Sequence, residues 1–171
     1  MNHSDRSASP YGLTIRPLAA ADRGSLAELP GRVSPHSAIS RFHGAVSRLS
    51  EPFLDQLLDL REGQREAVIA LDGREIVGVA RFARDAEDAD TAEVAVLVAD
   101  EWQHRGVAHQ MLRPLIARAV SAGITRLRAD ILAENTAARR LFAEVGPTLR
   151  ESVVNGHVVV TIDLSTTVER P

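Results

Sequence analysis

Short apolar runs and alternating apolar and polar residues fill the middle of the chain, which is the pattern of β-strands. The segment EAVIALDGREIVGVARFARD at 66–85 holds two such runs joined at Asp72–Gly73, a dipeptide that favours a tight hairpin. TAEVAVLVAD at 91–100 is a third strand-like run, and Asn155–Gly156 divides a second hairpin at 148–164. The pattern therefore predicts a largely antiparallel sheet.

Other stretches carry the three-to-four-residue spacing of amphipathic helices. The longest, RGVAHQMLRPLIARAVSAG, is closed by Gly123 as a C-cap. Pro114 lies inside it and is expected to kink the helix at a cost of roughly 3 kcal/mol. A strand at 124–132 and a helix at 134–146 follow. Nearer the N-terminus, helices are predicted at 19–29 with Asp22 as cap, at 34–43 with Pro35 at its start, and at 50–61 with Ser50 as cap.

The order of these elements predicts one α/β (α+β) domain with a mixed, mostly antiparallel central sheet flanked by helices. The strand–helix–strand unit in the middle should be a right-handed parallel crossover. We expect the domain to span 11–165, between a disordered polar leader at 1–10 and a short tail at 166–171.

Composition narrows the function classes. Hydrophobic residues make up 44% and charged residues 25% of the 171, as in a soluble globular protein, and the net charge of −3 gives no basic surface for nucleic acid. No apolar run could span a membrane, and the polar N-terminus lacks a signal core. The absence of cysteine excludes a thiol nucleophile, and the scattered histidines predict no metal site. A cytoplasmic protein without nucleic-acid or membrane partners is expected.

QHRGVA, between the third strand and the long helix, is the candidate ligand loop. Gly106 and Ala108 leave little bulk where unpaired helix N–H groups and a partial positive charge could hold a phosphate. A Walker A loop is excluded because the chain has no lysine, and antiparallel strands before the loop argue against a dinucleotide fingerprint. A tight turn without a ligand is the alternative.

The spacing Gln103-x-x-Gly106-x-Ala108 resembles the acetyl-CoA signature Q/R-x-x-G-x-G/A of the GNAT superfamily of N-acetyltransferases. The element order between about 13 and 164 is similar to that fold, and ENTAARRLFAEVG resembles its helix with an N-x-x-A motif. A narrower resemblance is to the acetyltransferase domain of bacterial protein-lysine acetyltransferases that act on acyl-CoA synthetases. It rests on two segments, SPHSAISRFHGAVSRLSEPFLDQLLD and AEVAVLVADEWQHRG.

This resemblance implies a single GNAT-type domain that uses acetyl-CoA as co-substrate, without a metal. The third strand would pair with the pantetheine arm, the loop would hold the pyrophosphate through its main chain, and an asparagine would steady the arm. The implied coenzyme-binding residues are Val96, Leu97, Val98, Gln103, His104, Arg105, Gly106, Val107, Ala108, His109 and Asn135.

Acetylation of an amine needs a base, because an amine of pKa ~10.4 is neutral in only about one molecule in a thousand near pH 7.4. The resemblance implies Glu93, and alternation places it on one strand face with Ala95 and Leu97. A solvated residue at the start of the strand is the alternative. Phe142 stands where many family members have a tyrosine as general acid, so the acid is not identified.

The expected reaction is direct transfer from acetyl-CoA to a primary amine in a ternary complex, since an acetyl-cysteine intermediate is impossible. The narrower resemblance favours a protein lysine as acceptor, with a small-molecule amine as alternative. Phe142 favours another alternative, a coenzyme-binding module without catalysis. A nucleotide-binding domain is a further alternative. An exposed strand edge could also pair two subunits in a homodimer.

Overall fold

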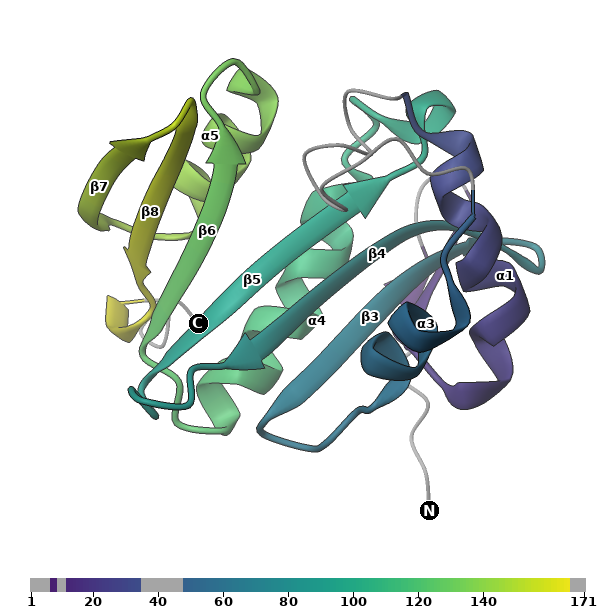
Figure 1. Cartoon of the computed structure of the whole chain (residues 1–171), viewed down its shortest axis with the longest axis horizontal. Helices are drawn as coiled ribbons and strands as arrows, with labels where there is room; N and C mark the ends of the chain where they lie inside the picture. The colour runs from purple at the N-terminus through teal and green to yellow at the C-terminus, as the bar shows by residue number, and fades with distance from the viewer. Residues whose placement is uncertain (1–6, 9–11, 35–47, 167–171) are drawn as a thin grey trace.

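The computed structural model describes residues 7–8, 12–34 and 48–166 (Figure 1). Within this part the strands form one sheet in the order β1-β2-β3-β4-β5-β6-β8-β7. Their bounds are β1 Ser7–Ala8, β2 Thr14–Pro17, β3 Arg65–Asp72, β4 Glu75–Arg84, β5 Thr91–Val98, β6 Arg126–Leu132, β7 Thr148–Val154 and β8 His157–Asp163. The expected leader at 1–10 thus contributes a two-residue strand that pairs with β2.

Helices cover both faces of this sheet. They are α1 Arg23–Glu28, α3 Glu51–Leu58, α4 Val107–Ser121 and α5 Thr136–Val145, with short 3₁₀ turns on either side of α1. The long helix α4 continues through Pro114. Of the helix expected at 34–43, only Ser34 lies within the described residues. No helix in the described ranges is both long enough and apolar enough to cross a membrane.

The strand pairing confirms the mixed, mostly antiparallel sheet and the crossover between β5 and β6. β2 to β5 are antiparallel neighbours, and β6, β8 and β7 form a second antiparallel group. β5 and β6 are parallel, but they pair only where Thr91–Glu93 lies beside Arg126–Arg128. Beyond that point the two strands diverge, which opens the sheet in Figure 1.

Each face of the sheet has its own core. On one face, α4 packs Met111, Leu112 and Leu115 against Phe82 and Leu127. This contact is close at Gly78, where an added Cβ would lie 2.8 Å from the Met111 Cε. The two faces therefore present different surroundings to β5, since alternate residues of a strand point to opposite sides.

On the other face, leucines of α1 and α3 cover β3, β4 and the end of β5. Leu26, Leu54 and Leu57 belong to the same buried cluster as Ile69 and Leu97. α1 and α3 lie in front of the sheet in Figure 1, with α4 behind it. We refer to these as the α1/α3 face and the α4/α5 face of the sheet.

Candidate functional site

A cleft of about 650 Å³ lies where β5 and β6 diverge. Val94–Val98 of β5 form one wall, and the end of β6 with the start of α5 forms the other. The loop before α4 and its first turn close one end. This volume is in the range of pockets that bury a small molecule or a cofactor.

The N-terminus of α4 opens onto this cleft. Gly106 is the residue before the helix and has φ 75°, a left-handed conformation that glycine adopts without strain. The amides of Val107, Ala108 and His109 donate to no acceptor in the described part of the chain, and the first helical bond runs from the Gln110 N–H to the Gly106 carbonyl at 3.1 Å. Three free donors at the positive end of a helix dipole are suited to bind an anion.

The side chain of Gln103 braces the loop that leads to this helix. Its Nε2 donates to the Val98 carbonyl at 3.1 Å and to Asp100 Oδ1 at 3.0 Å. Gln103 therefore ties the loop to the end of β5, a role that its position in the Q/R-x-x-G-x-G/A pattern does not indicate. The guanidinium carbon of Arg105 lies 5.2 Å from the centre of the Trp102 ring, within the range of a cation–π contact.

Most of the residues expected to bind the coenzyme come together at the cleft. Arg105 and Glu93 are not among the residues that line it. Those that do are Val96, Leu97, Val98, Gln103, His104, Gly106, Val107, Ala108, His109 and Asn135.

Asn135 has a structural task that the sequence analysis missed. It stands before the first turn of α5, and its Oδ1 accepts a hydrogen bond from the Ala138 N–H at 3.0 Å. Within the described residues, its NH₂ group donates to no partner. The side chain therefore caps the helix through its oxygen and leaves its nitrogen for another acceptor.

Two histidine–carboxylate pairs also lie at the cleft. His109 of α4 contacts Glu144 of α5 at 2.6 Å, which joins the two helices. Asp130 of β6 lines the cleft and contacts His157 Nδ1 of β8 at 2.7 Å. The register of β6 and β8 places Asp130 and His157 on one face, a placement that no local sequence pattern indicates.

Glu93 lies at the point where β5 leaves β6. It shares a strand face with Ala95, which lines the cleft, and with Leu97 of the α1/α3 core, as alternation predicts. Its side chain is 57% exposed, and its Oε2 lies 3.7 Å from Arg128 Nη2.

Phe142 is buried and lines the cleft, so its ring brings no proton donor there.

Comparison with known proteins decides the family. The model of the acetyltransferase (GNAT) family matches residues 36–146. The chain belongs to this family. The GNAT acetyltransferase is 36% identical over 137 residues to Acetyltransferase PA5475 of Pseudomonas aeruginosa, an alignment that covers 77% of this chain and 73% of that protein.

Solved GNAT structures have the same fold. The GNAT domain of S. lividans PAT superposes with a TM-score of 0.83 at 30% identity, covering 93% of this chain and 96% of that one. yncA of Salmonella typhimurium, solved with its cofactor acetyl-CoA, has a TM-score of 0.72 at 19% identity, with 90% and 94% covered. Acetyltransferase Pat of Mycolicibacterium smegmatis is 27% identical over 153 residues, and the alignment spans 88% of this chain but 45% of Pat.

Family membership confirms the expected enzyme class and co-substrate. The protein is an N-acetyltransferase that depends on acetyl-CoA, built as a single GNAT-type α/β domain. This result sets aside the nucleotide-binding alternative. In the stretches that the structure describes, no group of three or more His, Asp or Glu side chains is placed to hold a metal ion.

Proposed function

We propose that acetyl-CoA lies in the cleft between β5 and β6, and that a primary amine reaches its thioester from the α1/α3 face. The observation that supports this placement is the divergence of the two strands after Glu93, which leaves the edge of β5 beyond it without a partner on the β6 side. The main-chain groups of Val96–Val98 that point to this side would then pair with the amides of the pantetheine arm, apart from the Val98 carbonyl, which accepts from Gln103.

The pyrophosphate would lie at the start of α4. The free amides of Val107, Ala108 and His109 donate to its oxygens, and the helix dipole favours its negative charge. The side chain of Gln103 stays on Val98 and Asp100, so the contribution of this loop is chiefly its backbone.

Glu93 would accept the proton of the amine. The amine nitrogen forms a bond to the acetyl carbonyl carbon, the carbon–sulfur bond breaks, and CoA leaves as a thiolate. A main-chain N–H of β5 would stabilise the oxyanion. The contact with Arg128 keeps the Glu93 carboxylate on the acceptor side, where it would take a proton directly or through water.

A protein lysine is the acceptor that the sequence favours, through its resemblance to bacterial protein-lysine acetyltransferases. A small-molecule amine is the second candidate, and the open approach to Glu93 supports both. A cytoplasmic location and a homodimer complete the proposal. The dimer is supported by Leu149, Val153 and Val154, which are exposed on the edge strand β7.

The test is release of CoA thiol from acetyl-CoA, measured with lysine peptides from acyl-CoA synthetases and with small amines. Turnover with a peptide, together with mass-spectrometric detection of acetyl-lysine, would support the protein acceptor. Turnover restricted to small amines would replace it. Calorimetry that shows no acetyl-CoA binding after replacement of the α4 loop would support the cleft, and unchanged binding would contradict it.

A further inference from the structure

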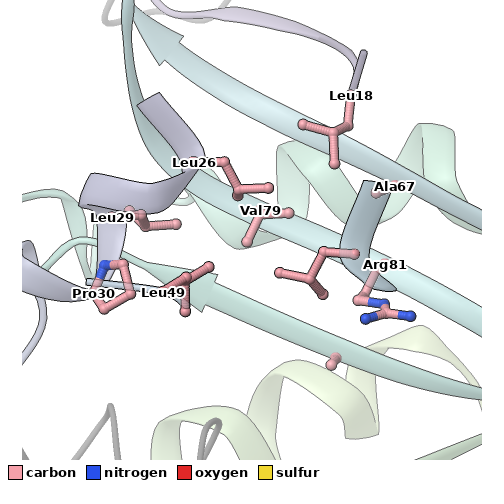
Figure 2. Close-up of a pocket in the computed structure, with 10 residues that line it drawn as sticks. Leu18, Leu26, Leu29, Pro30, Leu49, Ala67, Val79 and Arg81 are labelled. Atoms are coloured by element: carbon pink, nitrogen blue, oxygen red, sulfur yellow. The ribbon is translucent and has the colours of Figure 1, made fainter. Parts of the chain in front are cut away.

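A second, smaller pocket lies on the α1/α3 face, beside the cleft. Leucines of α1 and α3 and Val79 of β4 line it, and Arg81 of β4 closes one side. In Figure 2 the Arg81 guanidinium lies at one end of this apolar group, away from Leu29 and Pro30. Ala95 of β5 stands directly opposite Arg81 in the sheet register and lines both the pocket and the cleft. The two spaces therefore adjoin at a small side chain.

Arg81 is a half-buried cation without a partner. Burial lowers the pKa of Arg81, and the nearby charge of Arg65 lowers it further, while Glu93 raises it. No carboxylate in the described part of the chain lies within ion-pair distance of its guanidinium. Arg84 is also half-buried without an ion pair, but it donates to the backbone carbonyls of Gly63, Ala89 and Ala122, whereas Arg81 donates to no group among the described residues. Charged groups with restricted access to water are normally paired, so this guanidinium is suited to bind an anion.

A second arginine, Arg65, lies near Arg81. It lies on β3, on the same face as Arg81, and its Nη2 contacts Asp59 Oδ2 at 2.5 Å. Its Nε is buried and has no hydrogen-bond partner among the described residues. Glu93 is the carboxylate nearest in the register of β5, and it lies 3.7 Å from Arg128 instead. An anion entering from the cleft would meet the guanidinium of Arg81, with the charge of Arg65 nearby.

We propose that Arg81 binds a carboxylate of the acceptor, so that the preferred acceptor is an amine with a carboxylate a few ångströms from its nitrogen. The inference rests on the proposed function, because Glu93 on the same face would take the proton of that amine. A guanidinium binds a carboxylate through two parallel hydrogen bonds, which fixes orientation as well as charge. A free amino acid has this chemistry, and so does a protein lysine next to an aspartate or glutamate.

Matched acceptor pairs test the inference. Acetyl transfer is measured with amino acids against their amides, and with lysine peptides that carry aspartate against the same peptides with asparagine. We expect kcat/KM to be about 10-fold or more higher for the acceptor that carries the carboxylate. The pair with the larger ratio shows whether the preferred acceptor is a free amino acid or a protein lysine beside an acidic residue. Arg81→Gln should remove the preference by slowing the carboxylate member alone, and Arg81→Lys should keep part of it.

The matched control is Arg74→Gln, because Arg74 is exposed on the β3–β4 hairpin. This variant should leave kcat/KM unchanged for both acceptors of each pair. Equal rates for the two members with the wild-type protein, or an equal loss on both in Arg81→Gln, would overturn the carboxylate subsite while leaving amine acetylation intact. Absence of transfer to every amine would instead overturn the proposed acceptor site itself. If Arg81→Gln does not fold, the inference is tested by the kcat/KM ratio of the wild-type protein for the carboxylate acceptor against its amide.

Discussion

The two sides of the diverging strands β5 and β6 are built from different kinds of groups. On the α4/α5 side, the mouth of the cleft is one continuous segment, Gln103–His109, and it offers backbone amides at a helix N-terminus. On the α1/α3 side, the charged groups Arg65, Arg81, Glu93 and Arg128 come from four strands. The backbone site should tolerate side-chain changes that keep the helix, whereas the second site depends on single side chains.

The largest effect is expected on the side-chain site, at Glu93. Glu93→Gln keeps the size of the side chain but cannot accept the proton of the amine, so kcat should fall about 100-fold or more. The affinity for acetyl-CoA, measured by calorimetry, should stay unchanged. Glu87→Gln removes an exposed carboxylate from the loop before β5 and should keep full activity. Equal activity of the two variants would contradict the role of Glu93 as base.

A smaller but still large effect is expected at the backbone site. Ala108→Glu places a negative charge in the first turn of α4, where it should repel the pyrophosphate and raise the Kd for acetyl-CoA about 30-fold. The melting temperature should change little, because the favourable effect of an acidic residue in the first turn offsets the loss of the Ala108 contact with the core. Ala117→Glu, an exposed site later in the same helix, is the control. Equal affinities in both variants would place the phosphate elsewhere.

Asn135 separates helix capping from coenzyme binding. Asn135→Ser keeps an oxygen that can accept the Ala138 N–H but loses the NH₂ group. Since serine and asparagine cap helices about equally well, stability should change by less than about 0.5 kcal/mol, while the Kd for acetyl-CoA rises about 5-fold. Asn135→Ala should lose both properties and cost about 1 kcal/mol in a denaturant titration. A Kd that is unchanged in the serine variant would leave capping as the role of Asn135.

The smallest effect concerns the pH dependence of stability near α1. The hydrogen bond from Arg16, at 2.7 Å, lowers the pKa of Asp22 below its ordinary value of 3.8. This carboxylate therefore contributes stability that is fully present above pH ~4 and is lost as the pH falls through its folded-state pKa. Asp22→Asn should lower the free energy of unfolding by about 1 kcal/mol at pH 7. A difference between variant and wild type that does not shrink below pH ~4 would contradict the assignment.

Much of the fold could be predicted because its signals are local. The hairpin turns at Asp72–Gly73 and Asn155–Gly156 appear where the dipeptides predict them, and the crossover through α4 follows from the spacing of strand, helix and strand. The loop at Gly106 was found for the same reason, since the residues at a helix N-terminus are neighbours in the chain. The contact of Arg105 with Trp102 has no local signal of this kind, and coenzyme binding by Arg105 stays a prediction.

Local patterns in the sequence were therefore enough to predict most of the elements, the family and a candidate ligand loop at the start of α4. Only the tertiary structure decided which side chains meet across the sheet: Asp130 with His157, His109 with Glu144, and Glu93 with Arg128, next to an unpaired Arg81. These contacts depend on strand register and on where β5 leaves β6. Both are set by packing between segments far apart in the chain, and local residue patterns do not encode that packing.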